Sequence, residues 1–440
     1  MYHFFKDELK QEKNKLISSL PSPLMQKIIE SAQSVSDKGT VTADNMLQHI
    51  DHTQIEIVEG GVNIYDLIIR EIKKARKQIL IQTFVWMPDI QAVKDIKKAL
   101  CELKQDIDVF LLVDQLDFIA RTFFLGELPP QRPKHDPASL GLDGLPNNIR
   151  LHIGTYVHNF QAANHSKTIL VDEAVIVTGA NFQSENYGTN AFHDAAMFIP
   201  KGAADSVFHD FQTMWNLRTN KADEDCFPAH PPTNRDALNT NCPVLYVTNT
   251  IRLWPAILPL YQAALSPDPL NNTYLTIINH AEHIIRIAVP NINSLEVMQS
   301  LAHFINHRKG RVELLLSQNF NDFREMMYGG TNQSAIEHLS SMIEEHFKDN
   351  LQIRWFHQET GDKNNPINNQ MHMKFMAVDE SIVIYGSANL DYISLHNCHE
   401  GNFVFDNREF TKRATDTLFA PLFKQGIPAQ VTRNVSCLLM

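Results

Sequence analysis

The pattern H-x-K-x-x-x-x-D occurs twice in the chain and could serve nucleophilic and acid–base chemistry at a phosphate. The two copies comprise His165, Lys167 and Asp172, and His372, Lys374 and Asp379. An imidazole can attack phosphorus or transfer a proton, and an ammonium group can offset the charge of phosphoryl oxygens. Residues two apart on a strand point to one face, so each histidine is predicted beside its lysine. Each aspartate falls at the following turn, which makes it a support rather than a reactant.

A turn of small residues that ends in an asparagine follows each copy of the pattern. The turns are Thr178–Asn181 and Gly386–Asn389. Such turns let backbone and amide donors approach an anion closely. Asn181 and Asn389 are therefore candidate ligands of phosphoryl oxygens, with Ser387 as a supporting residue of the second turn.

Both copies lie within a longer internal repeat. Residues 69–89 and 274–294 each read as a helix running into a strand, and Ala75 and Ala281 are 206 positions apart. Each segment is followed by an amphipathic helix (92–103 or 295–307) and an apolar strand (109–114 or 312–317). Alternation of helices and strands is typical of parallel sheets. The chain therefore contains two copies of one α/β unit.

Over residues 55–425 the chain resembles the phospholipase D superfamily, in which two HKD motifs meet between two similar lobes. The resemblance implies an α/β fold of two pseudo-symmetric lobes, each a mixed, largely parallel sheet flanked by helices, with the active site at the lobe interface. It also implies a ping-pong reaction that needs no metal or cofactor. His165 would form a phosphohistidine and His372 would protonate the leaving alcohol, although the pseudo-symmetry leaves the reverse assignment open. The groups that would hold the phosphoryl oxygens are Lys167, Lys374, Asn181 and Asn389.

A histidine–acid dipeptide starts a further apolar strand in each half, His193-Asp194 in the first and His399-Glu400 in the second. A carboxylate that accepts one imidazole N–H fixes the tautomer and stabilises the cation that forms. In the superfamily, an acidic residue near this position supports the motif histidine. We therefore expect Asp194 and Glu400 to orient the two motif histidines; the alternative is that both are solvated carboxylates.

The repeat and the polar stretch 216–242 suggest four parts. Residues 1–45 are expected to form a helical extension, 46–220 the first half, 221–430 the second half and 431–440 a tail. The tail ends in a C-a-a-X box, Cys437–Met440, which predicts farnesylation by a host prenyltransferase; an unmodified apolar terminus is the alternative. One chain carries both half-sites, so catalysis requires no oligomer.

Composition separates the candidate partners. A net charge of −11 and a pI near 6.0 argue against a nucleic-acid partner. The N-terminus lacks the apolar run of a signal peptide, and no stretch is long enough to span a membrane. The five cysteines are widely spaced, which fits a reducing compartment. The partners expected are a phospholipid substrate and a membrane surface.

The HKD motifs together with the prenylation box resemble the LpdA-type effector phospholipases D of intracellular bacteria. This resemblance implies secretion into a host cell, attachment to the cytosolic face of host membranes, and hydrolysis of glycerophospholipids to phosphatidic acid. Three alternatives stay open. They are a nuclease of the same superfamily, a phosphatidyltransferase similar to cardiolipin synthases, and an inactive scaffold.

Overall fold

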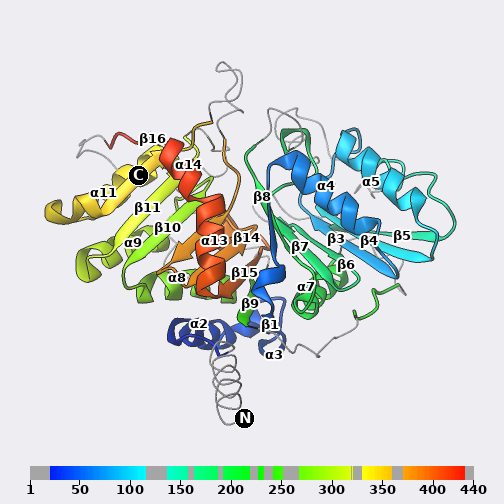
Figure 1. Ribbon diagram of the computed structural model, residues 1–440, viewed down its shortest axis with the longest axis horizontal. Helices are drawn as coiled ribbons and strands as arrows, with labels where there is room; N and C mark the ends of the chain where they lie inside the picture. Colours follow the sequence, from blue (N-terminus) through cyan, green and yellow to red (C-terminus); the bar gives the residue numbers. More distant parts are fainter. Residues whose placement is uncertain are drawn as a thin grey trace, which may run out of the picture.

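Two α/β lobes lie side by side in the computed structural model (Figure 1). The structure describes residues 20–114, 136–156, 163–186, 192–218, 226–231, 241–250, 267–318, 320, 330–358 and 370–431. The first lobe contains β2 (Glu56–Glu59), α4 (Gly61–Ile72), β3 (Gln78–Thr83), α5 (Gln91–Glu102), β4 (Ile107–Asp114), β5 (Ile149–Tyr156), β6 (Thr168–Val171), β7 (Ala174–Thr178), β8 (Ala195–Ile199) and α7 (Ala204–Asn216).

The second lobe repeats this order with additions at its end. It contains β9 (Cys242–Thr248), α8 (Pro269–His280), β10 (Ile284–Val289), α9 (Leu295–Arg308), β11 (Arg311–Leu316), α11 (Asn332–Ser341), β12 (Leu351–Trp355), β13 (Phe375–Val378), β14 (Ile382–Gly386), α12 (Tyr392–His396), β15 (Gly401–Asp406), α13 (Arg408–Leu418), α14 (Ala420–Gln425) and β16 (Ile427–Pro428). The predicted repeat is confirmed. The helix–strand pair α5 and β4 of the first lobe recurs as α9 and β11 in the second, and each of these four elements lies within two residues of its predicted bounds.

Both sheets share one strand order, which confirms the pseudo-symmetric fold class. The first sheet runs β2-β8-β7-β6-β3-β4-β5, and the second runs β9-β15-β14-β13-β10-β11-β12 between two added edge strands. The prediction of largely parallel sheets is wrong in one respect. Parallel pairing is confined to β3-β4-β5 and β10-β11-β12, and the other described pairs are antiparallel. The strands of the HKD segments are joined by tight turns, which force antiparallel neighbours, whereas parallel neighbours need crossovers such as α5.

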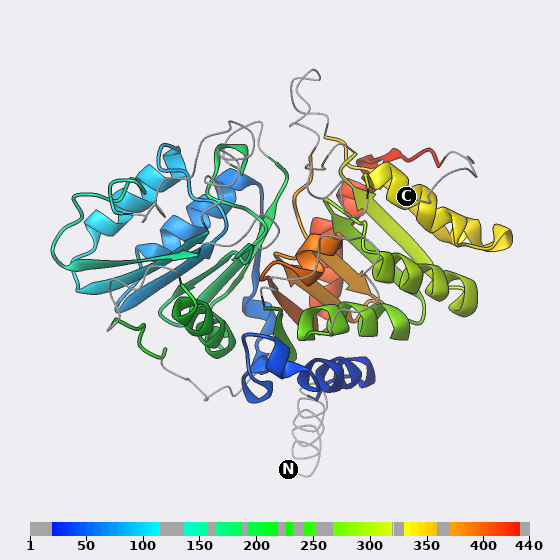
Figure 2. The same cartoon turned by 180° about the vertical axis from the view of Figure 1, so that it is seen from behind.

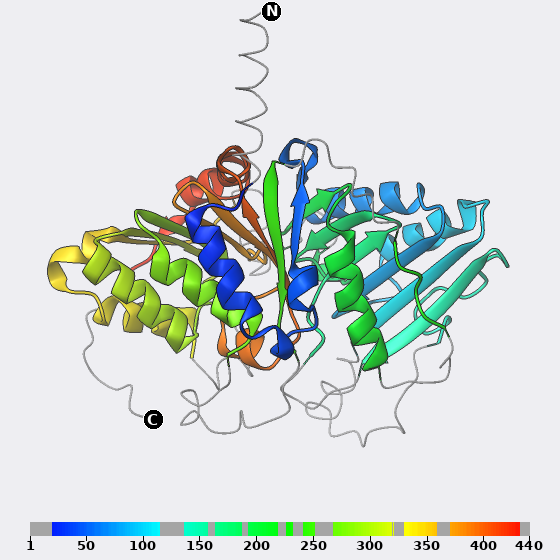
Figure 3. The ribbon, with the colours of Figure 1, turned by 90° about the horizontal axis from the view of Figure 1, so that it is seen from below.

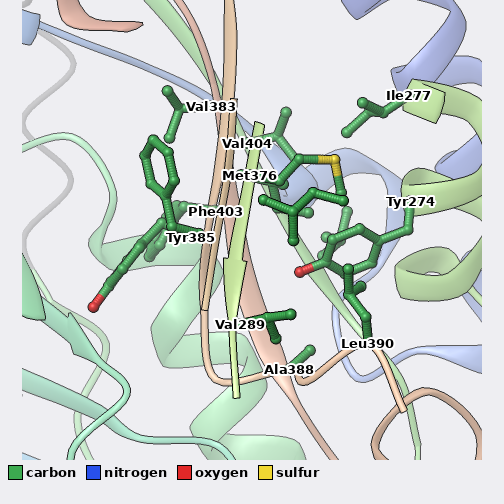
Figure 4. Packing of buried hydrophobic residues seen from close by; sticks show 14 of the residues in the cluster. Tyr274, Ile277, Val289, Met376, Val383, Tyr385, Ala388, Leu390, Phe403 and Val404 are labelled. Atoms are coloured by element: carbon green, nitrogen blue, oxygen red, sulfur yellow. The ribbon is translucent and has the colours of Figure 1, made fainter. Parts of the chain in front are cut away.

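Helices cover both faces of each sheet. In the first lobe, α4 and α5 pack on one face and α7 packs on the other (Figures 1 and 2). In α5 the buried residues are Ala92, Val93, Ile96, Ala99 and Leu100, a spacing that places them on one helical stripe. In the second lobe, apolar side chains project from both faces of β13, β14 and β15, with Tyr274 and Ile277 of α8 on one side and Tyr385 on the other (Figure 4).

One hydrophobic core runs through the lobe interface. It includes Leu80, Phe110 and Trp215 of the first lobe together with Tyr246 and Phe403 of the second. Buried apolar area of this kind stabilises the folded state by about 25 cal/mol per Å². The relative placement of the two half-sites therefore depends on shared core packing rather than on a linker.

The N-terminal segment belongs structurally to the second lobe. Helix α2 (Pro23–Gln33) lies beside α8, and α3 (Ala43–Met46) leads into β1 (Leu47–Ile50) (Figure 3). Strand β1 pairs antiparallel with β9, where the edge of the second sheet would otherwise be open. The expected start of the first half at residue 46 therefore precedes the point where the chain enters the first sheet, at β2.

The two motif aspartates tie strands together away from the histidines. The Asp172 carboxylate accepts the backbone N–H groups of residues 76, 77 and 78, and the Asp379 carboxylate accepts those of residues 282, 283 and 284, at 2.6–3.1 Å. Both residues have positive φ, 52° and 50°, a conformation that aspartate tolerates better than most residues. Each aspartate thus anchors the start of the central strand, β3 or β10, to the turn after the HKD strand.

Replacing either aspartate is expected to cost stability rather than chemistry. Asp172→Ala and Asp379→Ala should each lower the free energy of unfolding by about 2–3 kcal/mol, because three N–H groups lose their acceptor and alanine is strained at positive φ. Urea denaturation measures this loss, with Asp143→Ala, in an exposed ion pair with Lys97, as the control. A folded Asp172→Ala protein that has lost all activity would contradict the assignment as a support.

Candidate active site

Each HKD motif forms backbone hydrogen bonds with a residue of the other lobe that lies just before a strand. The backbone N–H of His165 donates to the carbonyl of His399 at 2.8 Å, and that of His399 donates back to Ala163 at 2.8 Å. The backbone N–H of His372 likewise donates to the carbonyl of His193 at 2.7 Å. Short parallel bridges, Asn164 to His399 and His193 to Met371, result on both sides. This exchange places both motifs at the lobe interface.

The same exchange pairs each histidine with a carboxylate from the other half. His165 Nδ1 lies 2.7 Å from Glu400 Oε1, and His372 Nδ1 lies 2.8 Å from Asp194 Oδ2. Both carboxylates are fully buried, whereas the exposed fraction is 14% for the His165 side chain and 5% for that of His372. A carboxylate at Nδ1 favours the tautomer in which Nε2 carries the lone pair. The structure therefore brings together the four predicted residues, in crossed pairs that the sequence did not indicate.

One further residue connects each carboxylate to a turn asparagine: Ser394 in the second half and Asn186 in the first. Neither residue was predicted from the sequence. The Ser394 hydroxyl accepts the backbone N–H of Asn389 at 2.9 Å and donates to Glu400 Oε1 at 2.5 Å. In the first half, the Asn186 side chain accepts the N–H of Asn181 at 3.3 Å and donates to Asp194 Oδ2 at 3.3 Å. Ser394 and Asn186 each lie five residues after the turn asparagine of their half. This repeated spacing of a polar residue could have identified both from the sequence.

The predicted supporting residue Ser387 also contacts a carboxylate. Its hydroxyl donates to Glu400 Oε2 at 2.5 Å and accepts the N–H of Gly401 at 3.1 Å. At the matching position of the first half stands Gly179, where an added Cβ would lie 2.3 Å from Asp194 Oδ1. The second half thus combines a longer acid with a serine, and the first half combines a shorter acid with a glycine.

Both motif lysines are almost completely buried beside their histidines. Lys167 Nζ donates to the carbonyl of His165 at 2.7 Å and lies 5.5 Å from the ring centroid of Phe84. Lys374 Nζ donates to the carbonyl of His372 at 2.5 Å and lies 3.0 Å from both of its ring nitrogens. The buried carboxylates of Glu400 and Asp194 offset part of the charge of these ammonium groups, and a bound phosphate would offset more of it.

Burial shifts the titration of these groups. It lowers the pKa of Lys167 to about 7 against the attraction of Glu400, and it raises the pKa of Glu400 to about 7 against the attraction of Lys167. Burial and the neighbouring Lys374 lower the pKa of His372 to about 4. At neutral pH His372 is therefore uncharged in the free site, and an anion near the lysines would raise its pKa.

Phenylalanine rings border both histidines. Phe84 meets His165 edge-on at a centroid distance of 4.9 Å, and Phe192 stacks on His372 at 5.6 Å. Phe320 lies 5.4 Å from His372 and packs against Phe192. Apolar walls of this kind exclude water and strengthen the electrostatic interactions between the charged groups.

The turn asparagines Asn181 and Asn389 are buried shortly after the ends of β7 and β14. Their backbone N–H groups donate to Asn186 and Ser394, as described above.

Among the described residues, no group of three or more His, Cys, Asp and Glu side chains could hold a metal ion. Within the same residues, no helix is long and apolar enough to cross a bilayer. Cys437 and the predicted prenylation box lie outside the described residues.

The comparisons with known proteins agree with this arrangement. The family described as "Cardiolipin synthase, PLD-like domain" matches residues 68–215 and 274–419, one match in each lobe. No curated protein matches the chain. The solved structure of phosphatidylserine synthase from Haemophilus influenzae Rd KW20 is similar in fold, with a TM-score of 0.60 and 14% identity over 88% of this chain and 90% of that one.

Two more distant solved structures are also similar. Nuc from Salmonella typhimurium, a phospholipase D family member, aligns with 43% of this chain and 99% of its own length, with 16% identity and a TM-score of 0.31. Polyphosphate kinase from Porphyromonas gingivalis aligns with 83% of this chain and 46% of its own length, with 12% identity and a TM-score of 0.46. At these values the two structures add nothing to the functional argument.

Proposed function

We propose, because the chain belongs to the family of cardiolipin synthase PLD-like domains, that it is a phospholipase D acting on glycerophospholipids. The reaction hydrolyses the head-group phosphodiester to phosphatidic acid and a free alcohol. The observation that carries the proposal is the pair of crossed histidine–carboxylate contacts beside two buried lysines. This constellation supplies a nucleophile, a proton donor and phosphate ligands within one chain.

In the proposed cycle, His165 attacks phosphorus and His372 delivers the proton to the leaving alcohol. Glu400 accepts a hydrogen bond from the Nδ1–H of His165, so Nε2 presents the lone pair. His165 is also the more exposed of the two histidines. Phosphate binding near Lys374 offsets the charge that lowers the pKa of His372, and this allows the ring to take up the proton that it then donates. Water, deprotonated by the same ring, then cleaves the phosphohistidine.

A phosphatidyltransferase is the second candidate. The family description names cardiolipin synthase, and the structural neighbour in Haemophilus influenzae is a phosphatidylserine synthase. Both reactions share the phosphohistidine and differ only in whether water or an alcohol accepts the phosphatidyl group. The acceptor therefore separates the two candidates.

Lipid products distinguish these candidates in one experiment. The purified protein is incubated with mixed phospholipid liposomes, with and without added glycerol or serine, and the lipids are measured by mass spectrometry beside the His165→Ala variant. We expect phosphatidic acid from the wild type alone. A predominant phosphatidylalcohol would favour the transferase, and cleavage of oligonucleotides but of no lipid would favour the nuclease and overturn the proposal.

We further propose that the protein is an effector of an intracellular bacterium, prenylated at Cys437 by the host and held on the cytosolic face of host membranes. A single farnesyl chain gives weak, reversible membrane binding, so the catalytic surface must contribute affinity. Cys437→Ser should leave activity on detergent-dispersed lipid unchanged and shift the protein from the membrane to the soluble fraction of host cells. A Cys437→Ser protein that stays membrane-bound would show that the tail is not the anchor.

A further inference from the structure

His399, the residue before Glu400, is fully buried between two acceptors. Its Nδ1 lies 2.6 Å from the main-chain oxygen of Asn249, and its Nε2 lies 3.1 Å from Asp210 Oδ1. A carbonyl oxygen can only accept, so Nδ1 must carry a proton, and the carboxylate favours a second proton on Nε2. The contact of Nε2 with Asp210 meets the distance of an ion pair but not the geometry of a hydrogen bond, so the carboxylate favours the imidazolium form of the ring through its charge. This ring belongs to the residue directly before Glu400.

The partner carboxylate of His399 is fully buried and hydrogen-bonded on both oxygens. Asp210 lies on α7 of the first lobe and accepts the Tyr246 hydroxyl at 3.0 Å and the Thr40 hydroxyl at 2.5 Å. A buried ion pair is costly unless further hydrogen bonds satisfy both members. These contacts meet that requirement, and through Thr40 they connect the N-terminal segment to the residues behind the active site.

The charge of His399 acts on Glu400. Burial has the largest single effect and would lower the pKa of His399. The contributions of Asp210, Asn249 and Glu400 together outweigh burial, so the pKa of His399 is raised above its ordinary value. Because the interaction between two charges is reciprocal, the imidazolium lowers the pKa of Glu400 below the value that burial would otherwise impose. Glu400 is near its titration point at neutral pH, so the charge of His399 adds to the effects of Lys167 and Lys374 on how much of Glu400 is ionised.

The first half lacks the buried ion pair. His193 makes the same backbone bridge as His399, but its Nε2 lies 3.4 Å from Glu59 Oε2, and the Glu59 side chain is one-third exposed. An ion pair with an exposed carboxylate contributes little. The repeat therefore conserves the histidine in both dipeptides, while only the His399 side has a carboxylate sealed in the core.

We propose that Asp210 and His399 are positioning residues that keep Glu400 ionised, and thereby hold His165 in its reactive tautomer. The inference rests on the proposed function, since it assigns His165 a part in the reaction. Neither residue contacts the phosphate in this scheme. Both act through Glu400, whose carboxylate lies 2.7 Å from Nδ1 of His165.

Other titratable groups also face Glu400 from the elements packed around it. They are His165, Lys167, Lys374, His399, Tyr246 and Tyr274. The two tyrosines stay neutral over the range of interest, because burial raises their pKa far above neutrality. The lysines and His399 are the cations that hold Glu400 ionised, and His399 is the one that can be altered without touching the phosphate ligands.

The pH dependence of kcat/KM tests the proposal. The substrate is bis(p-nitrophenyl) phosphate, a chromogenic diester that reports on the chemistry whatever the natural substrate is. Asp210→Asn and His399→Gln should each move the acidic limb of the profile to higher pH by about one unit, with about a tenfold loss of kcat near pH 6. Near pH 8.5 the rate should approach that of the wild type, and KM should stay within about twofold.

Three comparisons keep the outcome interpretable. His193→Gln, the matched change in the first half, should leave the acidic limb in place. The double variant Asp210→Asn/His399→Gln should shift the limb no further than either single one, because the positive charge at His399 is already lost in each single variant. If Asp210→Asn fails to fold, as judged by thermal unfolding, His399→Gln alone decides.

An equal loss of rate at every pH, or an unchanged profile in a folded His399→Gln protein, would overturn the inference. Failure of the proposed function is seen separately. A wild type that hydrolyses the chromogenic diester and no lipid would contradict the phospholipase proposal while leaving this test intact.

Discussion

Replacing either motif histidine with alanine is expected to lower kcat by about 10⁴-fold or more while the fold is retained. Each ring serves both steps of the proposed cycle, one as nucleophile and leaving group and the other as acid and then base. Loss of one ring therefore cannot be offset by the other, and the double variant His165→Ala/His372→Ala should be no slower than the worse single one. Initial rates on the chromogenic diester, with thermal unfolding as the folding control, measure this.

The intermediate distinguishes the two rings. With a substrate whose leaving group needs no proton, such as p-nitrophenolate, His372→Ala should still form the covalent adduct and then accumulate it, because the base for the second step is missing. Mass spectrometry of peptides prepared without acid should locate the p-nitrophenyl phosphoryl group on His165. A phosphate on His372, accumulating in the His165→Ala protein, would reverse the assignment. Absence of any adduct in both variants would contradict a covalent mechanism.

The repeat was the part of the fold that the sequence could predict. The near-constant offset between the halves depends on local patterns of apolar residues, and these determine single elements and their order. Sheet direction was predicted less well, because it depends on which strands become neighbours. The aspartate turns bring β6 back against β7, and no periodicity within a strand reveals that reversal.

The members of the candidate site could be predicted, but their partners could not. Asp194 and Glu400 were identified from their spacing to the motif histidines within each half, but this spacing did not indicate which histidine each carboxylate contacts. The crossing arises from the backbone bridges at His193 and His399, which are long-range contacts between lobes. The ion pair of His399 with Asp210 is still less accessible to sequence reasoning, since α7 carries no sign that one of its aspartates is buried.

Glu400→Gln is expected to lower kcat by about 10²–10⁴-fold, although it changes a single atom. Both hydroxyls that contact this carboxylate must donate to it. Ser394 already accepts the N–H of Asn389, and Ser387 already accepts the N–H of Gly401. An amide NH₂ at the Oε1 position would face the Nδ1–H of His165, and one at the Oε2 position would make the Ser387 hydroxyl turn its O–H away, so every orientation of glutamine alters at least one of the three contacts.

The pH dependence of the rate tests whether the ionised carboxylate of Glu400 is responsible for the loss of kcat in Glu400→Gln. Burial raises the pKa of Glu400 to about 7, so in the wild type its acceptor role is present above that pH and is lost as the pH falls through it. The residual activity of Glu400→Gln should lack this contribution to the acidic limb, because glutamine has no proton to gain. Glu102→Gln, an exposed change on α5, should keep both the rate and the limb.

Asp194→Asn provides the matched change in the other half. Asn186 and the backbone N–H of Ala195 both donate to Asp194, so asparagine meets the same conflict and should also slow the reaction. Among the described residues, no fully buried ion pair like that of His399 with Asp210 lies behind Asp194, since His193 faces Glu59, whose side chain is one-third exposed. The acidic limb should therefore respond to Glu400→Gln more than to Asp194→Asn. Equal pH profiles for the two variants would show that the two carboxylates are electrostatically equivalent, and that the asymmetry between the halves has no consequence for the reaction.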